Sequence, residues 1–547
     1  MENSTNPTID QDKHRLARNS MWAIAGTFLS RLSGIVRTLV VNATFGANTT
    51  LDAFNAAFRF PNSLRDLFAD GALSAAFVKV LVDLSPEGDA AIKRLVSITS
   101  GFFLSITLIL AIFAAIFAKP FIHLIGGHEF NTRGGLNLAA SLFQILAFYL
   151  PITMLNAIVM GVLGLRGDMF RAMNGSIFLS VGMIAGALLF PPLFHLLQWP
   201  EIYGLALGAM IGVILQLVYQ IQPLIRWKLL ALPVFNPIKW WRYNPLFEIL
   251  RLMTPRALGQ GALVIALMFN TFFAIQIGKG ALTYVATTVI IIQVPIGLFG
   301  VATGFASLPL LTQAFNERHF KRLQFLLNQS LATTNWLGLS TLIGLSLLIV
   351  PFYTLIFQHG KITAHDTIQN SIAICAYGIG IFFASSGKIL LNVLYAINAT
   401  RQIVINSIVY LIVNVFLSAL LAPRFGLVGL GVSFATATAV DCWLNYFVLN
   451  HRIKRQLNEA PFSLKYTSMF ATAGVFSYFI GLIGVWLCKN FWPHFEIIAG
   501  FTWNTMSAMV SLLILFGIIL LVFIPLCWRF GPQQLQQLLK KMYGWIR

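Results

Sequence analysis

Charge is scarce in this sequence, since Asp, Glu, Lys and Arg make up only 10% of its 547 residues. Ordinary soluble domains carry roughly 25%. Acidic residues are the scarcer kind, because 18 Asp and Glu stand against 37 Lys and Arg. Hydrophobic residues account for 57% of the chain, and the mean hydropathy is +0.78. These proportions exclude a water-soluble domain and a disordered chain, and they indicate an all-α polytopic membrane protein.

The patterns of several catalytic and metal-binding classes are also missing. The four cysteines show no Cys-x-x-Cys spacing, and the nine histidines show no His-Glu-x-x-His motif. There is neither a Walker loop nor a Gly-x-Ser-x-Gly motif, so nothing supports an ATPase or a serine hydrolase. We expect a transporter and not an enzyme, with no catalytic residues, no metal site, no resident cofactor and no nucleic acid partner.

Fourteen apolar segments are long enough to cross a bilayer as helices, each of which needs about 20 residues. The predicted spans are residues 21–45, 58–83, 95–118, 137–163, 172–196, 202–225, 246–277, 282–314, 324–357, 368–397, 403–422, 426–450, 463–487 and 503–527. Because the number of spans is even, both ends of the chain are expected on the same side of the membrane.

The distribution of positive charge predicts which side that is. With both termini in the cytoplasm, the inner loops and tails carry 22 Lys and Arg. The outer loops then carry only six, which are Lys119, Arg133, Lys279, Lys361, Arg424 and Lys489. Inner loops of membrane proteins are enriched in Lys and Arg, so this asymmetry predicts cytoplasmic termini.

The sequence repeats itself at a nearly constant interval. Several dipeptides recur 231 residues further on, for example Val162-Leu163 as Val393-Leu394. Six predicted helices separate the copies, so the copies keep one orientation, and we infer two parallel six-helix bundles followed by helices 13 and 14. The predicted segments are a cytoplasmic tail at 1–20, a first bundle at 21–227, a cytoplasmic interfacial linker at 228–245, a second bundle at 246–450, helices 13 and 14 at 451–527, and a cytoplasmic tail at 528–547.

Nine basic side chains fall inside predicted spans, but only five acidic ones do. They are Arg31, Arg37, Arg59, Arg65, Lys79, Arg251, Arg256, Lys388 and Lys465, against Asp52, Asp66, Asp70, Glu248 and Asp441. Arg31 lies deepest, about 15 Å from either end of its span at 1.5 Å per residue. An arginine that faces lipid at that depth costs about 2.5–3.5 kcal/mol, so we expect Arg31 to face a water-filled cavity or a partner.

The arginines near Arg31 in sequence predict a site for a polyanion. A guanidinium offers two parallel hydrogen bonds to a phosphate and never loses its proton. Arg59, Asp66 and Asp70 are spaced seven and four residues apart, so on a regular helix they share a face and hold one another in place. Pairing or snorkelling at helix ends is the alternative for Arg31, Arg37, Arg59 and Arg65. It is the favoured interpretation for Lys79, Arg251 and Lys465.

Polar side chains also enter predicted helices 11 and 12, namely Asn406, Asn414, Ser433, Thr436 and Thr438. Ordinary hydrogen bonds between helices are the favoured interpretation, and a bound coupling cation such as sodium is the alternative. The aromatic and basic stretch at residues 239–242 is predicted to lie along the inner membrane interface.

A distinctive set of motifs lies mostly in the first two predicted helices. It consists of Ser30-Arg31-Leu32-Ser33-Gly34 with Arg37, Asp52-Ala53-Phe54, Phe58-Arg59-Phe60-Pro61-Asn62, Leu64-Arg65 and Asp70-Gly71-Ala72, joined later by Phe357–Ala364. In these motifs the chain resembles the MurJ (MviN) family of lipid II flippases, which belongs to the multidrug/oligosaccharidyl-lipid/polysaccharide exporter superfamily. The likeness covers roughly residues 20–450.

This resemblance implies a flippase that serves cell wall synthesis by alternating access. Its implied cargo is lipid II, an undecaprenyl-pyrophosphate-linked glycan lipid, moved from the inner to the outer leaflet of the bacterial inner membrane. By motif position, the implied substrate-binding residues are Arg31, Arg37, Arg59, Arg65, Asp52 and Asp70. Lipid II and the surrounding membrane lipids are the implied partners.

One departure from the family leaves other functions open. Val289 and Ile290 stand where the family usually carries a polar pair with a cavity cation, and Arg256 and Lys388 are the candidates to replace that charge. The close alternative is a flippase for another polyprenyl-linked glycan, such as an O-antigen unit. More distant ones are a cation or drug exporter, which should need more carboxylates, and a membrane glycosyltransferase, which should need a large outer loop.

Overall fold

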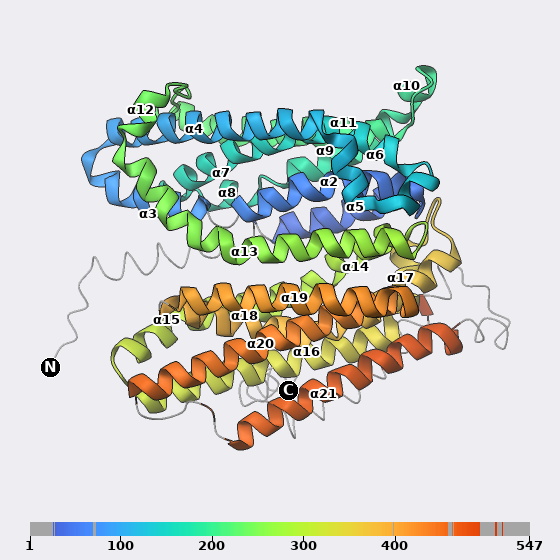
Figure 1. The fold of residues 1–547 in the computed structure, drawn as a ribbon. Coiled ribbons are helices and arrows are strands. Elements are labelled where there is room, and N and C mark those ends of the chain that lie inside the picture. The colour runs from blue at the N-terminus through green and yellow to red at the C-terminus, as the bar shows by residue number, and fades with distance from the viewer. Residues whose placement is uncertain are drawn as a thin grey trace, which may run out of the picture. The chain divides into compact units, whose positions relative to one another are not determined.

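All regular secondary structure in the described part of the chain is helical (Figure 1). The computed structural model describes residues 26, 28–68, 73–397, 399–457, 462, 464–492, 509, 510 and 517. Among these, ten helices are long and apolar enough to cross a membrane, and one bent helix pair would add an eleventh. The predicted fold class, an all-α polytopic membrane protein, is therefore confirmed. Most of the fourteenth predicted span lies outside the described residues, so the count of fourteen stays a prediction.

Contacts between Cα atoms divide the chain into two compact units. Unit 1 is Met1–Phe45 with Thr49–Val264, and unit 2 is Gly46–Asn48 with Ile265–Arg547. The division falls inside one long helix, α13 (Asn244–Ile277). The limits of the segments predicted from the sequence, including the linker at 228–245, stay predictions.

Unit 1 starts with a helix whose described part is residues 28–45. Its other elements are α2 (Thr49–Leu67), α3 (Leu73–Leu84), η2 (Ser85–Glu87), α4 (Asp89–Ile116), α5 (Ala118–Thr132), α6 (Gly135–Leu146), α7 (Tyr149–Leu165), α8 (Met169–Asn174), α9 (Ile177–Leu189), α10 (Pro191–Leu196), α11 (Ile202–Arg226), α12 (Pro237–Trp241) and the first part of α13.

The predicted second span, 58–83, has the wrong start. The helix α2 already begins at Thr49 and continues through Pro61 to Leu67, and the next described helix, α3, begins at Leu73. The first turn of α2 is polar, so its low average hydropathy predicts a loop. Asp52 in that turn is nevertheless buried. A carboxylate in the first turn is stabilised by the positive end of the helix dipole, which explains why the helix extends that far.

Glycines bring α9 and α11 together. Gly182 and Gly186 of α9 lie against Gly204, Gly208 and Gly212 of α11, and a Cβ added at Gly204 would stand 2.6 Å from the carbonyl oxygen of Gly186. In membranes, where helices gain little from hydrophobic burial against one another, such close backbone approach provides much of the packing energy. The two helices therefore pack at backbone distance.

The segment before α13 is held against α4. The amide of Val234 donates to the carbonyl oxygen of Ser97 at 3.1 Å, and the indole Nε1 of Trp240 donates to the carbonyl oxygen of Val234 at 2.7 Å. Gly101 of α4 has no room for a Cβ beneath Val234. The short helix α12 exposes Trp241, which is 75% accessible, beside basic residues. This mixture is typical of an interfacial segment, as predicted for residues 239–242.

Unit 2 contains the remaining part of α13 and a second set of helices. They are α14 (Ala281–Pro295), η3 (Ile296–Val301), α15 (Ala302–Asn316), α16 (Phe320–Phe357), α17 (Ala364–Gly378), α18 (Gly380–Ala396), α19 (Thr400–Phe425), α20 (Leu427–Leu457), α21 (Leu464–Trp486) and η4 (Leu487–Phe491). The π-helical turn η3 follows directly on Pro295, where the missing N–H interrupts the α-helical ladder.

Candidate functional site

The helix at residues 28–45 and α2 carry the predicted site residues that the structure describes. Arg31 is exposed and Arg37 is half-buried on the first of these helices. Asp52 is buried, and Arg59 and Arg65 are half-buried, on α2. Asp70 lies outside the described residues. The five described residues all belong to unit 1.

Arg65 is held from two sides. Its Nη2 donates to Oδ1 of Asp66 at 2.6 Å and its Nε to the same oxygen at 3.2 Å. Its Nη1 donates to the hydroxyl of Tyr149, at the start of α7, at 3.1 Å. Tyr149 is fully buried and meets Phe58 edge to face. These contacts fix the plane of the guanidinium, so its orientation does not depend on a ligand.

Arg37 lies within electrostatic reach of both Tyr149 and Arg65. Two guanidinium groups are therefore gathered near one phenol, although their helices are separated in sequence. Like charges at close range repel unless an anion lies between or beside them. Asp66 offsets one of these two charges, so the cluster keeps one net positive charge and electrostatically favours an anionic ligand over a neutral one.

Arg31 lies outside the packed face of its helix. Ser30 contacts Ser176 and Ser33 donates to the Ser180 hydroxyl at 3.2 Å, so these serines lie on the face of the helix that packs against α9 within unit 1. Arg31 remains exposed. An arginine this deep in a predicted span is expected to face water or a partner, and the exposure of Arg31 is consistent with that expectation.

The other intramembrane charges have different surroundings. Lys79 pairs with Glu248 at 3.8 Å, as the pairing interpretation expects. Asp66, expected to share a face with Arg59, forms its short ion pair with Arg65. Lys388 is exposed on α18 of unit 2 and lies within electrostatic reach of Asp441. The side chain of the other candidate replacement cation, at position 256, is not described.

Tyr149 belongs to this site, although no sequence pattern singles it out. It is 84 residues from Arg65, and a single tyrosine at the start of an apolar helix carries no motif. Only its contact with the arginine identifies it. A periodicity argument cannot find such a partner, because periodicity describes one helix at a time.

The polar residues of the predicted eleventh and twelfth helices mostly bond within their own helices. Ser433, Thr436 and Thr438 each donate to the carbonyl oxygen four residues earlier. The amide of Asn406 donates to Asn445 at 2.9 Å, between α19 and α20. Ordinary hydrogen bonds therefore account for these four. Among the described residues, no three His, Cys, Asp or Glu side chains are grouped as a metal site would require.

The family model and the most similar curated proteins carry the same family name. The model of the family described as "Lipid II flippase MurJ" matches residues 41–524. A probable lipid II flippase MurJ of Vibrio cholerae is 30% identical over 444 residues, which are 80% of this chain and 82% of that protein. The lipid II flippase MurJ of Burkholderia cenocepacia is 28% identical over 427 residues, or 78% and 82% of the two chains.

Solved structures show the same fold. A lipid II flippase MurJ in an inward closed conformation has a TM-score of 0.70 and 23% identity, covering 93% of this chain and 99% of the other. An inward-facing multidrug resistance MATE family transporter of the MOP superfamily has a TM-score of 0.62 and 16% identity, with 80% and 98% covered. The motifs around Arg31 predict this family, and the family model spans most of the sequence. The chain therefore belongs to the MurJ family of lipid II flippases.

Proposed function

We propose that this protein carries lipid II from the inner to the outer leaflet of the bacterial inner membrane by alternating access. Membership of the MurJ family supports this cargo, since relatives that match most of the chain are named for it. The structural observation that carries the proposal is the gathering of Arg37 and Arg65 around Tyr149 in a membrane-spanning unit.

The chemistry of the cargo explains why arginines are used. A pyrophosphate presents several anionic oxygens, pairs of which match the two parallel N–H donors of a guanidinium. When the pyrophosphate leaves water, these donors replace the hydrogen bonds that it made to water. Arg31 is the most exposed of the three arginines and is the first to meet the headgroup. Arg37 and Arg65 then complete the coordination, while the polyprenyl tail stays in the lipid.

The energy for transport comes from outside the protein. With the cell interior negative, each negative charge moved outward gains about 2.3 kcal/mol per 100 mV of membrane potential. No resident cofactor is part of this mechanism. A coupling cation such as sodium, or consumption of the exported lipid, is the alternative source.

Orientation follows from the charge asymmetry of the loops, which supports cytoplasmic termini. A green fluorescent protein fused after Arg547 fluoresces only when it folds in the cytoplasm, so we expect a bright fusion. A fusion that is dark while an alkaline phosphatase fusion at the same place is active would reverse the orientation and with it the direction of transport.

The function is tested in cells whose own lipid II flippase can be depleted. Expression of this chain should restore growth and the exposure of lipid II to a probe confined to the outer face. Removal of the charge-assisted hydrogen bonds of Arg65 in Arg65→Ala costs about 1.5–3 kcal/mol each, so activity should fall at least tenfold. Arg65→Lys keeps the charge but loses the fork, and should recover only part of it.

Arg251→Ala is the matched control, because Arg251 is exposed on α13 and none of the described contacts of the arginine site involves it. It should behave as the parent chain. The proposal fails if the parent chain reaches the membrane in normal amount and lipid II still accumulates on the inner face. If it instead rescues O-antigen export and not lipid II export, the close alternative suggested by Val289 and Ile290 holds.

A further inference from the structure

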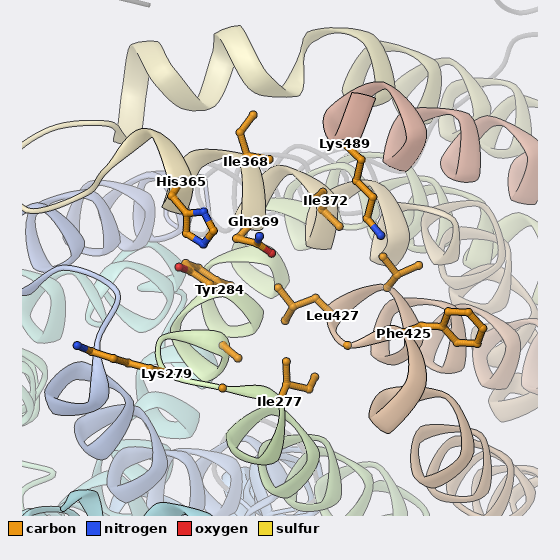
Figure 2. A pocket seen from close by; sticks show the side chains of 14 residues that line it. Ile277, Lys279, Tyr284, His365, Ile368, Gln369, Ile372, Phe425, Leu427 and Lys489 are labelled. Carbon is orange, nitrogen blue, oxygen red and sulfur yellow. The ribbon is translucent and has the colours of Figure 1, made fainter. Parts of the chain in front are cut away.

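Unit 2 contains a cavity of about 460 Å³ at one end of its helices, separate from the arginine site (Figure 2). Its walls come from the end of α13, the start of α14, the first turns of α17, the junction of α19 and α20, and η4. In Figure 2 the ring of His365, the amide of Gln369 and the ammonium of Lys489 point toward the same space. Lys279 lies at its edge, and its ammonium points away from that space.

The charge of this cavity has one sign. Lys279, Lys489 and His365 line it, and no Asp or Glu does. Asp366, the nearest carboxylate in sequence, is used elsewhere, since it accepts hydrogen bonds from the amide and hydroxyl of Thr363 and from the hydroxyl of Tyr284. That arrangement caps α17 and turns the carboxylate toward Thr363 and Tyr284, so the carboxylate itself does not line the cavity.

Helix ends of both kinds lie at the cavity. The helix α14 begins at Ala281, directly after Lys279 and Gly280, and α20 begins at Leu427, directly after Gly426. Both junction residues line the cavity or adjoin residues that do. The first N–H groups of a helix carry a partial positive charge, but the carbonyl ends of α13 at Ile277 and of α19 at Phe425 lie at the same cavity and carry a partial negative one. The lysines, and not the helix dipoles, therefore give the cavity its positive charge.

Membrane topology does not account for this gathering of lysines. The predicted outer loops carry only six basic residues, and two of them, Lys279 and Lys489, meet at one cavity although they lie far apart in the chain. Outer loops are the side on which Lys and Arg are depleted. A local function therefore explains their position better than an orientation signal.

The cavity lies at headgroup level. Five candidate membrane spans begin or end beside it, at residues 257–277, 281–300, 400–425, 427–455 and 467–491. Phe425, in its wall, is 59% exposed, and the nearby Trp486 and Phe491 are exposed as well, as aromatic residues at a membrane interface are. Ile277, Ile368 and other apolar residues complete the lining, so an occupant needs both an anionic and an apolar part.

We propose that this cavity binds the phosphodiester headgroup of an anionic phospholipid, with Lys489, His365 and Gln369 around the phosphate. The apolar wall meets the glycerol and the first methylene groups of the acyl chains. The binding itself depends on neither the lipid II cargo nor the orientation of the chain, so its failure and that of the proposed function are distinguishable.

The test is native mass spectrometry of the purified full chain titrated with phosphatidylglycerol and, separately, with zwitterionic phosphatidylethanolamine. The parent chain should retain phosphatidylglycerol at least tenfold more tightly. The double variant Lys279→Gln/Lys489→Gln should lose that preference, whereas Lys361→Gln/Arg424→Gln, which removes two predicted outer charges that do not line the cavity, should keep it. Equal retention by the two double variants would overturn the proposal.

Gln369→Glu separates a charge effect from loss of folding, because it replaces one amide atom and leaves both lysines in place. It should weaken phosphatidylglycerol retention at least fivefold while the elution volume in gel filtration stays that of the parent. Inorganic phosphate is the last arm. If millimolar phosphate raises the thermal stability of the parent as much as phosphatidylglycerol does, and lipid adds nothing further, the site takes a soluble anion and the lipid assignment is wrong.

Discussion

The contact between α9 and α11 allows one substitution to be worked out in full. A Cβ added at Gly212 of α11 would stand 2.7 Å from the carbonyl oxygen of Phe178 and 2.8 Å from the Cα of Leu179. Both are backbone atoms of α9, which cannot rotate aside as a side chain can. The variant Gly212→Ala therefore has to push the two helices apart.

Two opposing effects determine how much Gly212→Ala changes the free energy of unfolding. Alanine is better than glycine in a helix by about 0.8–1.0 kcal/mol. Overpacking a well-packed contact typically costs about 1–3 kcal/mol. Gly344 of α16 isolates the first effect, because an added Cβ there has no atom within 4 Å. We expect Gly344→Ala to be slightly more stable than the parent, and Gly212→Ala to be about 1–3 kcal/mol less stable than Gly344→Ala.

The assay is unfolding of the purified chain by sodium dodecyl sulfate in mild-detergent micelles, followed by far-ultraviolet circular dichroism. The difference between the two alanine variants is the quantity of interest, since the gain in helix propensity is common to both. Equal unfolding free energies would refute the reasoning, because they would mean that α9 and α11 do not approach at backbone distance.

Three further outcomes are expected. Tyr149→Phe removes the hydrogen bond to Arg65, worth about 1.5–3 kcal/mol for a charged donor, so lipid II exposure in the depletion assay should fall roughly tenfold while the amount of folded protein is unchanged. Gly101→Ala should release the segment packed on α4, detectable as faster proteolysis before α12, and an unchanged cleavage rate would contradict that packing. Cys375 and Cys488 contact at 3.9 Å, so copper phenanthroline should oxidise both thiols to one disulfide visible by mass spectrometry; no cross-link would argue against the contact of α17 with η4 beside the cavity.

The sequence predicted the membrane-spanning helices well where their apolar runs were long, and less well where a helix carries polar residues. The helix α2 illustrates the failure, because Thr49, Asp52 and Arg59 lower its average hydropathy although several of its residues are buried. A hydropathy window treats every polar residue as exposed to water. In a transporter, the polar face of a helix turns inward, and the boundary is then placed too late.

The site was predictable in its charges and not in its contacts. Arg31, Arg37 and Arg65 stand out because burying an arginine in a bilayer is costly enough to require a reason. Tyr149, which holds one of them, carries no such cost and comes from a different helix. The role of Lys489 was equally unpredictable, since a lone lysine in a predicted outer loop has no recognisable function in the sequence. Only the structure shows that it lines a cavity together with Lys279 and His365. Single-sequence patterns describe one element at a time, and these residues acquire meaning only when elements pack.

In the proposed mechanism, the ion pair of Arg65 with Asp66 has a further role in turnover. Arg65 is 22% exposed and its partner Asp66 is 51% exposed, so water can take over the carboxylate when a pyrophosphate displaces it. An arginine without this partner would be costly in an empty cavity and would hold a dianion too tightly to release it. With the partner, binding becomes an exchange of one anion for another, and the net gain is the difference between the two. A transporter needs such a small difference, because a cargo bound with the full strength of several charge-assisted hydrogen bonds would not leave on the outer side.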